Sequence, residues 1–330
     1  MEPQSATPAP PWDPELAQYL AKLQSFTPPD CLRPDTIIEV RAKLAEWPVP
    51  SISDLERKGK FCVSEVEVLR EGESAAVPLL ICRPAAAPDE LLPAVYFIHG
   101  GGMVMGNNRL GLDHVLDIAE ELRFGVVSVD YRLAPEFPHP VPIEDCYSGL
   151  QWVASSGGDH GLDPLKIVVA GDSAGGGLAA SLALLARDRG GPSLTGQILN
   201  APMLDDRNNT FSSYQMAGLG IWDRVSNESG WRALLGEASG GPDVSPYAAA
   251  ARAHDLSGLP PAYLEVGSAE TFRDEVVAFA SRIWACGGQA ELHVWPGAFH
   301  GFFLDLPTAA LSLAAREARV AWLRRLLASR

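Results

Sequence analysis

Apolar and polar positions along this chain of 330 residues follow two periods. Helical periodicity comes first, in two amphipathic stretches at residues 15–26 and 35–47. Alternation of period two begins at Phe61, and a second strand-like run covers residues 75–84 after a polar turn at 70–74, which predicts an antiparallel hairpin. Because the two helices are short, we expect them to pack on a larger unit.

Beyond residue 90, apolar runs alternate with amphipathic segments, which predicts a parallel sheet with helices on both faces. The expected strands lie at residues 94–99, 125–131, 166–171, 196–203, 262–267 and 291–296. The expected helices lie at residues 112–123, 143–155, 176–189, 272–286 and 308–328. Residues 204–259 interrupt this alternation, and a connection of that length usually has a function in a compact domain.

A G-x-S-x-G sequence stands between an expected strand and an expected helix, at residues 171–175. A sharp turn from strand to helix projects its central side chain above the sheet, and the flanking glycines relieve crowding. This context predicts Ser173 as a nucleophile; the alternative is a turn in which Asp172 or Ser173 only caps the helix.

The same stretch also fits the glycine pattern of a dinucleotide-binding turn, through Gly175, Gly177 and Ala180. These glycines begin two residues after Ser173, so we expect them inside the helix, where packing against the sheet explains them.

Three successive glycines follow His99 and precede Met103. Their unobstructed N–H groups suit the oxyanion that forms when an alcohol attacks an ester, and the residue after the nucleophile, Ala174, is expected to supply a further N–H. A flexible loop is the simpler alternative, and a phosphate-binding loop lacks its Lys-Ser/Thr pair here. We expect His99 to support this loop by hydrogen bonding rather than to act as a base.

A catalytic serine requires a base and an orienting carboxylate, in the chain order Ser, acid, His. His300 follows the last expected strand and is the predicted base, whereas His293 lies within that strand and His254 within the long interruption. Glu270, close to the end of the strand at 262–267, is the predicted acid, and Asp274 one turn later is the alternative.

Composition narrows the possible partners. The chain has 26 Lys and Arg against 41 Asp and Glu, a net charge of −15, which argues against nucleic-acid or anionic-membrane binding. The five cysteines are odd in number and lack C-x-x-C spacing, so buried free thiols are expected. The first residues show neither the basic nor the apolar region of a signal peptide, and we expect a cytoplasmic protein with no metal and no cofactor.

Taken together, the motifs HGGGM at 99–103, DYRLAPE at 130–136 and GDSAGG at 171–176, with the loops of Glu270 and His300, resemble the hormone-sensitive-lipase-like, or bacterial type IV, esterases. The resemblance covers roughly residues 60–325. It implies an α/β-hydrolase fold with an eight-stranded, mostly parallel sheet flanked by helices, and a helical cap. The cap corresponds to residues 1–55 and 205–258, and the catalytic core to residues 56–204 and 259–330.

The resemblance also implies roles for individual residues: Ser173 as nucleophile, His300 as base, and the N–H groups of Gly101, Gly102 and Ala174 as the oxyanion hole. The family most often has Asp at the acid position, where this chain has Glu270. The DYR residues at 130–132, like Asp172, are expected to be scaffold.

We therefore expect a serine carboxylesterase that acts on small or short-acyl esters, aromatic ones included. Apolar side chains offered for the substrate are Met103, Phe211, Tyr214 and Trp222. Lactones, acetylated natural products and carbamates stay open as substrates, as do a dehydratase (lyase) and a non-catalytic ligand receptor as other functions. Residues 289–297 read as an edge strand, so a homodimer is possible by family analogy and a monomer nearly equally so.

Overall fold

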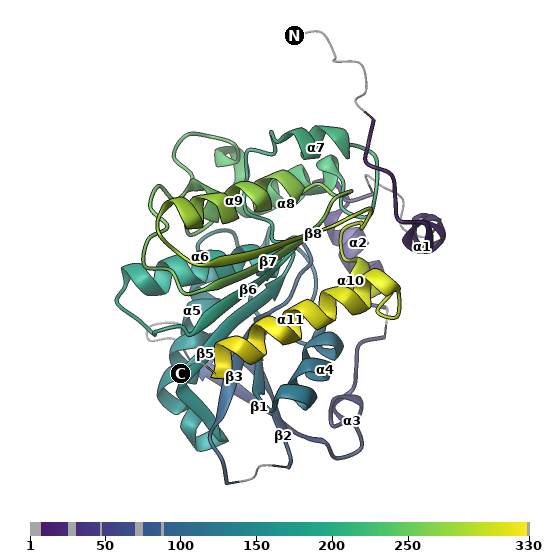
Figure 1. Cartoon of the computed structure of the whole chain (residues 1–330). Coiled ribbons are helices and arrows are strands. Elements are labelled where there is room, and N and C mark those ends of the chain that lie inside the picture. Colours follow the sequence, from purple (N-terminus) through teal and green to yellow (C-terminus); the bar gives the residue numbers. More distant parts are fainter. Residues whose placement is uncertain (1–7, 26–30, 47, 70–74, 87–88, 329–330) are drawn as a thin grey trace.

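One sheet of eight strands runs through the computed structural model, which describes residues 8–25, 31–46, 48–69, 75–86 and 89–328 (Figure 1). The strand order is β1-β2-β4-β3-β5-β6-β7-β8. Only β1 and β2, and β2 and β4, pair antiparallel; the remaining neighbours are parallel. The predicted hairpin and mostly parallel sheet are thus confirmed. The strands are β1 (Phe61–Leu69), β2 (Ala76–Pro84), β3 (Leu92–Ile98), β4 (Gly125–Val129), β5 (Leu162–Asp172), β6 (Gly196–Asn200), β7 (Ala262–Gly267) and β8 (Ala290–Trp295).

Helices cover both faces of this sheet. One layer holds α4 (Leu112–Leu122) and α11 (Ala310–Ala328), and the short α3 (Ile52–Leu55) packs on the same side. The other layer holds α5 (Val141–Ser156), α6 (Ala174–Asp188) and α9 (Arg273–Ala285) (Figure 1). The five helices predicted after residue 90 all form within two residues of their expected ends.

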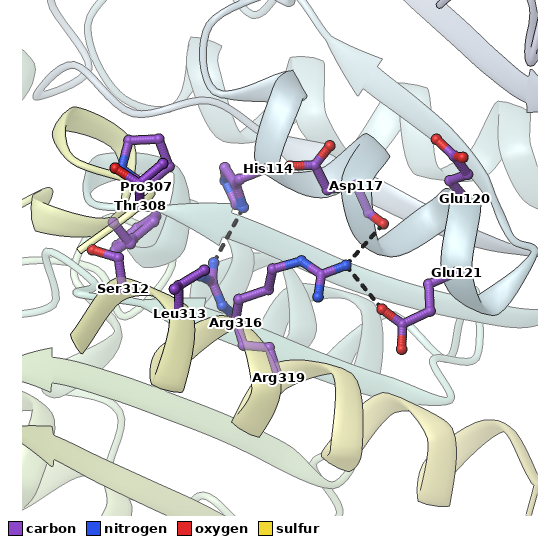
Figure 2. A pocket seen from close by; sticks show the side chains of 11 residues that line it. His114, Asp117, Glu120, Glu121, Pro307, Thr308, Ser312, Leu313, Arg316 and Arg319 are labelled. Carbon is purple, nitrogen blue, oxygen red and sulfur yellow. Dashed lines mark hydrogen bonds and ion pairs between the residues drawn. The ribbon is translucent and has the colours of Figure 1, made fainter. Parts of the chain in front are cut away.

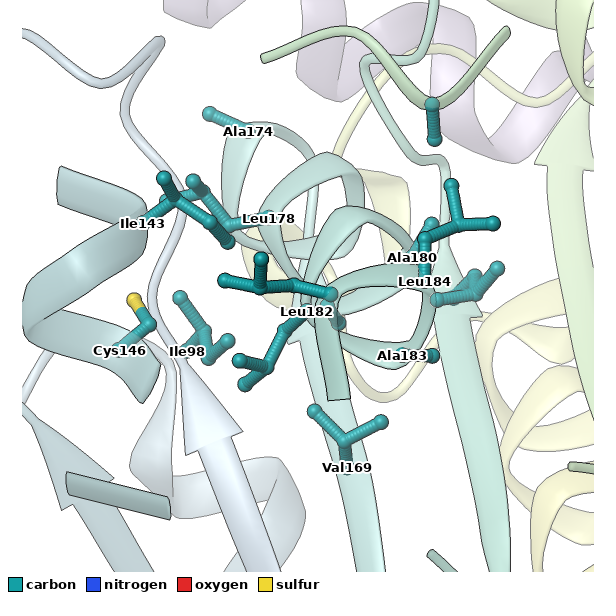
Figure 3. Close-up of a cluster of buried hydrophobic side chains, with 14 of the residues drawn as sticks. Ile98, Ile143, Cys146, Val169, Ala174, Leu178, Ala180, Leu182, Ala183 and Leu184 are labelled. Atoms are coloured by element: carbon teal, nitrogen blue, oxygen red, sulfur yellow. The ribbon is translucent and has the colours of Figure 1, made fainter. Parts of the chain in front are cut away.

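Burial on both faces explains why the central strands read as continuous apolar runs. In β3, Val95 and Phe97 pack toward the α4 and α11 layer, and Tyr96 and Ile98 pack toward the α5, α6 and α9 layer. Figure 3 shows Leu178 and Leu182 of α6 beside Ile98, Ile143 and Cys146, which come from β3 and α5. Helix α6 is therefore held between a neighbouring helix and the sheet, and its first residue is fixed relative to the strand ends.

The N-terminal segment and the long interruption contribute shorter elements. The two predicted N-terminal helices form as α1 (Pro14–Gln24), capped by Asp13, and α2 (Ile37–Leu44); the rest of those predictions, at Phe26 and Trp47, lies outside the described residues, as does the predicted turn at 70–74. Within the interruption are α7 (Phe211–Gln215), α8 (Arg224–Leu235) and the 3-10 turns η2 (Gly236–Ala238) and η3 (Ala250–Arg252). A further 3-10 turn, η1 (Gly157–His160), precedes β5, and α10 (Phe302–Asp305) follows His300.

Two expectations need correction. Strand β6 ends at Asn200 rather than at 203, because Ala201 adopts a positive φ of 44° that an extended strand does not allow. All five cysteines are free, but Cys62 is exposed because it lies on β1, at the edge of the sheet, and Cys31 and Cys286 are only partly buried. No helix among the described residues has both the length and the apolar content needed to cross a bilayer.

Candidate active site

Ser173 occupies the turn between β5 and α6, with φ 57° and ψ −120°. This conformation is rare for a residue with a side chain and persists only where the surroundings fix it. The backbone on both sides supplies that restraint: the Ser173 N–H donates to the Asn200 carbonyl at 2.8 Å, and its own carbonyl accepts from the N–H groups of Gly177 and Met203, each at 3.0 Å.

The glycines around Ser173 are required because main-chain atoms fill the space where a Cβ would stand. A Cβ on Gly171 would overlap the carbonyl of Gly175, and one on Gly175 would overlap the carbonyl of Ile98 at the end of β3. Gly175 and Gly177 lie inside α6, as predicted, where Gly177 meets the Met203 carbonyl in the same way. The G-x-S-x-G spacing is thus explained by close backbone packing, and a dinucleotide-binding turn is not formed.

The structure brings Ser173, His300 and Glu270 together from three separate loops. Ser173 Oγ lies 2.9 Å from His300 Nε2, and His300 Nδ1 lies 3.3 Å from Glu270 Oε2. The side chain of His300 is 11% exposed and that of Glu270 only 1%, so the serine end of the array faces outward and the carboxylate end is buried. This order of groups can remove a proton from a hydroxyl and stabilise the imidazolium that results.

A second buried carboxylic acid, Glu275, stands near Glu270. Its Oε1 accepts hydrogen bonds from the N–H groups of Leu204 (2.7 Å) and Asp205 (3.2 Å), where the long interruption begins. Burial raises the pKa of Glu275 well above its usual range, and the negative charges of Asp205 and, to a smaller extent, Glu270 raise it further. Sequence reasoning did not identify Glu275, because it follows Asp274 on α9 and no motif marks its burial.

The glycine loop after β3 lies directly against the Ser173 turn. A Cβ on Gly100 would stand 3.0 Å from the Asp172 carbonyl and 3.4 Å from Ser173 Cβ. Gly101 and Gly102 both have positive φ values, 105° and 63°, and the Gly101 carbonyl accepts from two later N–H groups, which closes the loop into a tight turn. A side chain at position 100 would therefore crowd the Ser173 turn, which explains the glycine there.

Three N–H groups of this region are unoccupied. Among the described residues, none accepts a hydrogen bond from the N–H of Gly101, Gly102 or Ala174. Ala174 is the first residue of α6, so its N–H is one of those that a helix leaves without an internal partner. Such donors beside a serine hydroxyl are suited to an oxygen that gains negative charge.

His99 and Tyr131 hold the glycine loop through ring stacking and hydrogen bonds to its main chain. Their rings are stacked at 4.2 Å, the Tyr131 hydroxyl donates to the His99 carbonyl at 3.0 Å, and His99 Nδ1 lies 2.8 Å from the Gly100 carbonyl. Complete burial lowers the pKa of His99 to about 4, so at neutral pH the ring is uncharged and its Nδ1–H donates to Gly100. This is the supporting role that the sequence suggested.

The rest of the DYRLAPE segment also holds the loop. Arg132 forms two side-chain hydrogen bonds with the buried Asp145, at 2.8 and 2.7 Å, and the N–H of Ala134 donates to the Met103 carbonyl at 2.9 Å. Arg41 of α2 adds bonds to the carbonyls of Val104 and Ala134, both at 2.6 Å. Sequence reasoning missed Arg41, since an arginine on an amphipathic helix usually faces solvent.

The other polar candidates lie elsewhere. Asp274 Oδ2 accepts from the N–H of Ser212 at 2.7 Å and its other oxygen pairs with Arg273, so it anchors α7. His293 contacts Glu291 on β8, and His254 is exposed in the long interruption. The described residues contain no cluster of His, Cys, Asp and Glu placed to bind a metal ion.

Of the four predicted substrate-contacting side chains, one lies beside the candidate triad. The centroid of the Trp222 ring is 6.5 Å from that of His300, and the Trp222 ring packs on Gly102. Met103 is completely buried in the main core, so it offers no surface to a ligand, and we do not retain it as a substrate contact. Phe211 and Tyr214 are more than half exposed on α7. Phe272 was not predicted; its ring lies nearly perpendicular to that of His300, with the two centroids 5.1 Å apart.

Comparison with known proteins places this geometry in a family. A family model described as the α/β hydrolase fold matches residues 95–304. Carboxylesterase NlhH of Mycobacterium tuberculosis is 35% identical over 323 residues, which covers 90% of this chain and 92% of that protein. Among solved structures, a bacterial heroin esterase superposes with a TM-score of 0.84 at 34% identity, covering 96% of this chain and 98% of the other. Esterase LipW of Mycobacterium marinum superposes with a TM-score of 0.85 at 31% identity, covering 97% and 98%.

Proposed function

The chain belongs to the hormone-sensitive-lipase-like family of α/β-hydrolases and is a carboxylic ester hydrolase, and we propose that it cleaves small esters through an acyl-enzyme on Ser173. The main support for this proposal is the array of Ser173, His300 and Glu270, in which His300 Nε2 lies 2.9 Å from Ser173 Oγ and His300 Nδ1 lies 3.3 Å from Glu270 Oε2. The named relatives, carboxylesterase NlhH and a heroin esterase, support the reaction class.

The first half of the reaction acylates the serine. Ser173 Oγ attacks the ester carbonyl while His300 Nε2 takes the hydroxyl proton, and Glu270 accepts from His300 Nδ1–H so that the imidazole keeps the tautomer in which Nε2 is free to act as base. The carbonyl oxygen becomes an oxyanion, for which Gly101, Gly102 and Ala174 supply N–H donors. Collapse of the tetrahedral intermediate breaks the bond to the alcohol oxygen, which leaves with the proton from Nε2.

The second half returns the enzyme to its starting state. Water gives a proton to His300 Nε2 and its oxygen attacks the acyl carbonyl, again forming an oxyanion against the same N–H groups. Breaking the bond to Ser173 Oγ releases the carboxylic acid, and the imidazolium returns the proton to the serine. One ester and one water give one acid and one alcohol.

The walls near the triad favour apolar substituents on the ester. Trp222 and Phe272 flank His300 from the long interruption and from the start of α9. A planar or short apolar group fits beside two aromatic rings, because such contacts gain from burial without requiring a polar partner. We therefore propose short-acyl and aryl esters as the substrate class, with Trp222 as a substrate contact and Phe211 and Tyr214 at the outer rim of the cap.

The decisive test compares wild type with Ser173→Ala on p-nitrophenyl acetate and butyrate, with fluorophosphonate labelling of Ser173 as an independent readout. We expect the substitution to abolish labelling and to reduce hydrolysis by at least about 10³-fold. Mass spectrometry of the products adds a second criterion, because hydrolysis adds the mass of water whereas elimination does not. Retained hydrolysis in Ser173→Ala, or an absence of labelling in the wild type, would contradict the proposal.

A further inference from the structure

Both carboxylate oxygens of Asp172, the residue before Ser173, accept hydrogen bonds from side-chain donors. Oδ1 accepts from Asn200 Nδ2 at 2.8 Å, and Oδ2 lies 2.8 Å from His114 Nε2. Asp172 and Asn200 are 3% and 2% exposed. Since the Asn200 carbonyl also accepts the Ser173 N–H, these contacts link the strained turn to the end of β6 and to α4.

The partner on the other side of His114 determines its tautomer. His114 Nδ1 lies 3.1 Å from Nη1 of Arg319 on α11, and a guanidinium has only donors. Nδ1 must therefore accept, so Nε2 carries the hydrogen and donates it to Asp172. The rings of Phe97 and Phe303 lie nearly perpendicular to the imidazole, with centroids 5.9 and 5.3 Å from its centroid.

Arg319 is itself held in place deep in the fold. It is 3% exposed, its guanidinium lies over the Phe303 ring at 4.7 Å, and its Nε is 3.6 Å from Glu265 Oε1. The other oxygen of Glu265 accepts from the Tyr263 hydroxyl and from Trp295 Nε1, at 2.9 and 3.1 Å. Buried charges require partners of this kind, so Arg319 has little freedom to move away from His114.

An open cavity of about 690 Å³ between α4 and α11 borders this chain of contacts (Figure 2). His114 and Arg319 both line it, and the figure shows their side chains reaching toward each other from the two helices. The cavity leaves free space on one side of the imidazole, and Gln and Asn have fewer side-chain atoms than His, so either amide can replace His114 without a new collision with Phe97 or Phe303. Position 114 is therefore open to substitution without overpacking.

We propose that His114, fixed by Arg319, is a positioning residue for Ser173: its hydrogen bond to Asp172 holds the strained turn so that the hydroxyl and the Ala174 N–H keep the geometry of attack. The inference rests on the proposed role of Ser173. A displacement of about 1 Å in a reacting group can reduce a rate by about 10²-fold, so a lost restraint at this turn affects turnover more than substrate binding.

The experiment compares His114→Gln with His114→Asn. The amide nitrogen of Gln reaches about as far from the backbone as His Nε2, whereas that of Asn falls short by one methylene, so the two variants differ in reach and not in polarity. We expect His114→Gln to keep most of kcat on p-nitrophenyl acetate. We expect His114→Asn to lose about tenfold in kcat with KM within twofold, and to slow fluorophosphonate labelling of Ser173 by the same factor.

Two further variants separate the outcomes. His254→Asn makes the same substitution at an exposed position of the long interruption and should leave kcat and labelling unchanged. Arg319→Lys keeps a positive charge near Glu265 but loses the planar donor to Nδ1, so it should also lower kcat with little effect on KM, which provides a second test if His114→Asn does not fold. Equal kcat in the Gln and Asn variants, or a loss that appears in KM and in thermal stability alone, would overturn the inference. In that case loss of activity in Ser173→Ala would still leave the proposed esterase mechanism intact.

Discussion

The indole ring of Trp222 lies directly on the α-carbon of Gly102, so that a Cβ at this glycine would overlap ring atom Cη2. The main-chain oxygen of Trp222 in turn accepts a hydrogen bond of 2.6 Å from Thr271 Oγ1, next to Glu270. One aromatic residue of the long interruption therefore contacts both the candidate oxyanion loop and the loop of the candidate acid.

Gly102→Ala should inactivate the enzyme without unfolding it. The new methyl group must displace Trp222 or the loop, and φ at this position is +63°, which an alanine adopts with strain. We expect kcat to fall by about 10²- to 10³-fold, the range seen when one oxyanion donor is lost. Gly218→Ala is the control, because φ is +73° there and nothing lies within 4 Å. Equal losses in the two variants would assign the effect to backbone strain alone.

Trp222→Ala should shift specificity toward bulkier esters. Removal of the ring opens space beside His300 while the triad residues stay in place, so the ratio of kcat/KM for a bulky aryl ester to that for the acetate should rise by about tenfold. A panel of acyl and aryl esters measures the ratio. Trp284→Ala is the control, since that ring is 47% exposed on α9 and its N–H donates to the Ala290 carbonyl. An unchanged ratio would remove Trp222 from the substrate contacts.

Glu270→Gln should lower kcat by about 10²- to 10⁴-fold while the protein stays folded. The amide of Gln can donate to His300 Nδ1, which stabilises the tautomer that is unable to act as base. Glu270→Asp keeps the charge but retracts it from the 3.3 Å contact, so the expected loss is smaller, about tenfold. Steady-state kinetics with Asp274→Asn as the matched variant identifies the acid, because Asp274 contacts Ser212 and should affect stability alone. The reverse result would assign the role to Asp274.

Arg41→Met should weaken catalysis from a distance. The substitution keeps an apolar stem but removes the bonds from α2 to the carbonyls of Val104 and Ala134, which hold the glycine loop, and the partly exposed ion pair with Glu136. We expect a three- to tenfold lower kcat/KM together with a lower Tm, roughly as for a lost pair of charged hydrogen bonds. Lys43→Met on the same helix removes only an exposed pair with Glu39 and should change neither quantity.

Asp305 makes stability depend on pH. Burial raises the pKa of its carboxyl to about 6 from an ordinary value near 3.8, while the nearby His300 lowers it slightly. Because the folded pKa is the higher one, the contribution to stability is full below pH 3.8 and is lost as pH rises through about 6. Asp305→Asn should therefore be more stable than wild type by up to about 3 kcal/mol above pH 7, with no difference near pH 4. Urea unfolding at several pH values tests this; a difference that does not vary with pH would contradict it.

The strands and helices of the core were predictable because a strand buried on both faces appears in the sequence as a nearly continuous apolar run. The run at residues 94–98 is apolar and the run at 262–267 is apolar except for Glu265, and the helices between them keep a regular period. The helices α7 and α8 were not predicted. They begin with side-chain caps from Thr210 and Asp223 but are rich in polar and small residues, so their burial depends on contacts with distant segments.

The candidate site shows the same division. Ser173 and Gly102 stand in motifs whose spacing reflects main-chain packing, which a local sequence pattern records. Met103 was misplaced because three successive positive φ values, at residues 101–103, turn its side chain inward to the core. His114 and Arg41 act through contacts more than 50 residues away along the chain, and no local pattern indicates such contacts.

The glycines at the Ser173 turn meet main-chain oxygens of Ile98, Gly175 and Met203, and these neighbours have no rotamers by which to adapt. The glycines among residues 171–177 therefore tolerate no side chain, whereas residues of the long interruption such as Trp222 do not contact these glycines. Directed evolution of new ester specificities should accordingly be confined to positions such as Trp222, and libraries that include the turn would consist mostly of inactive variants.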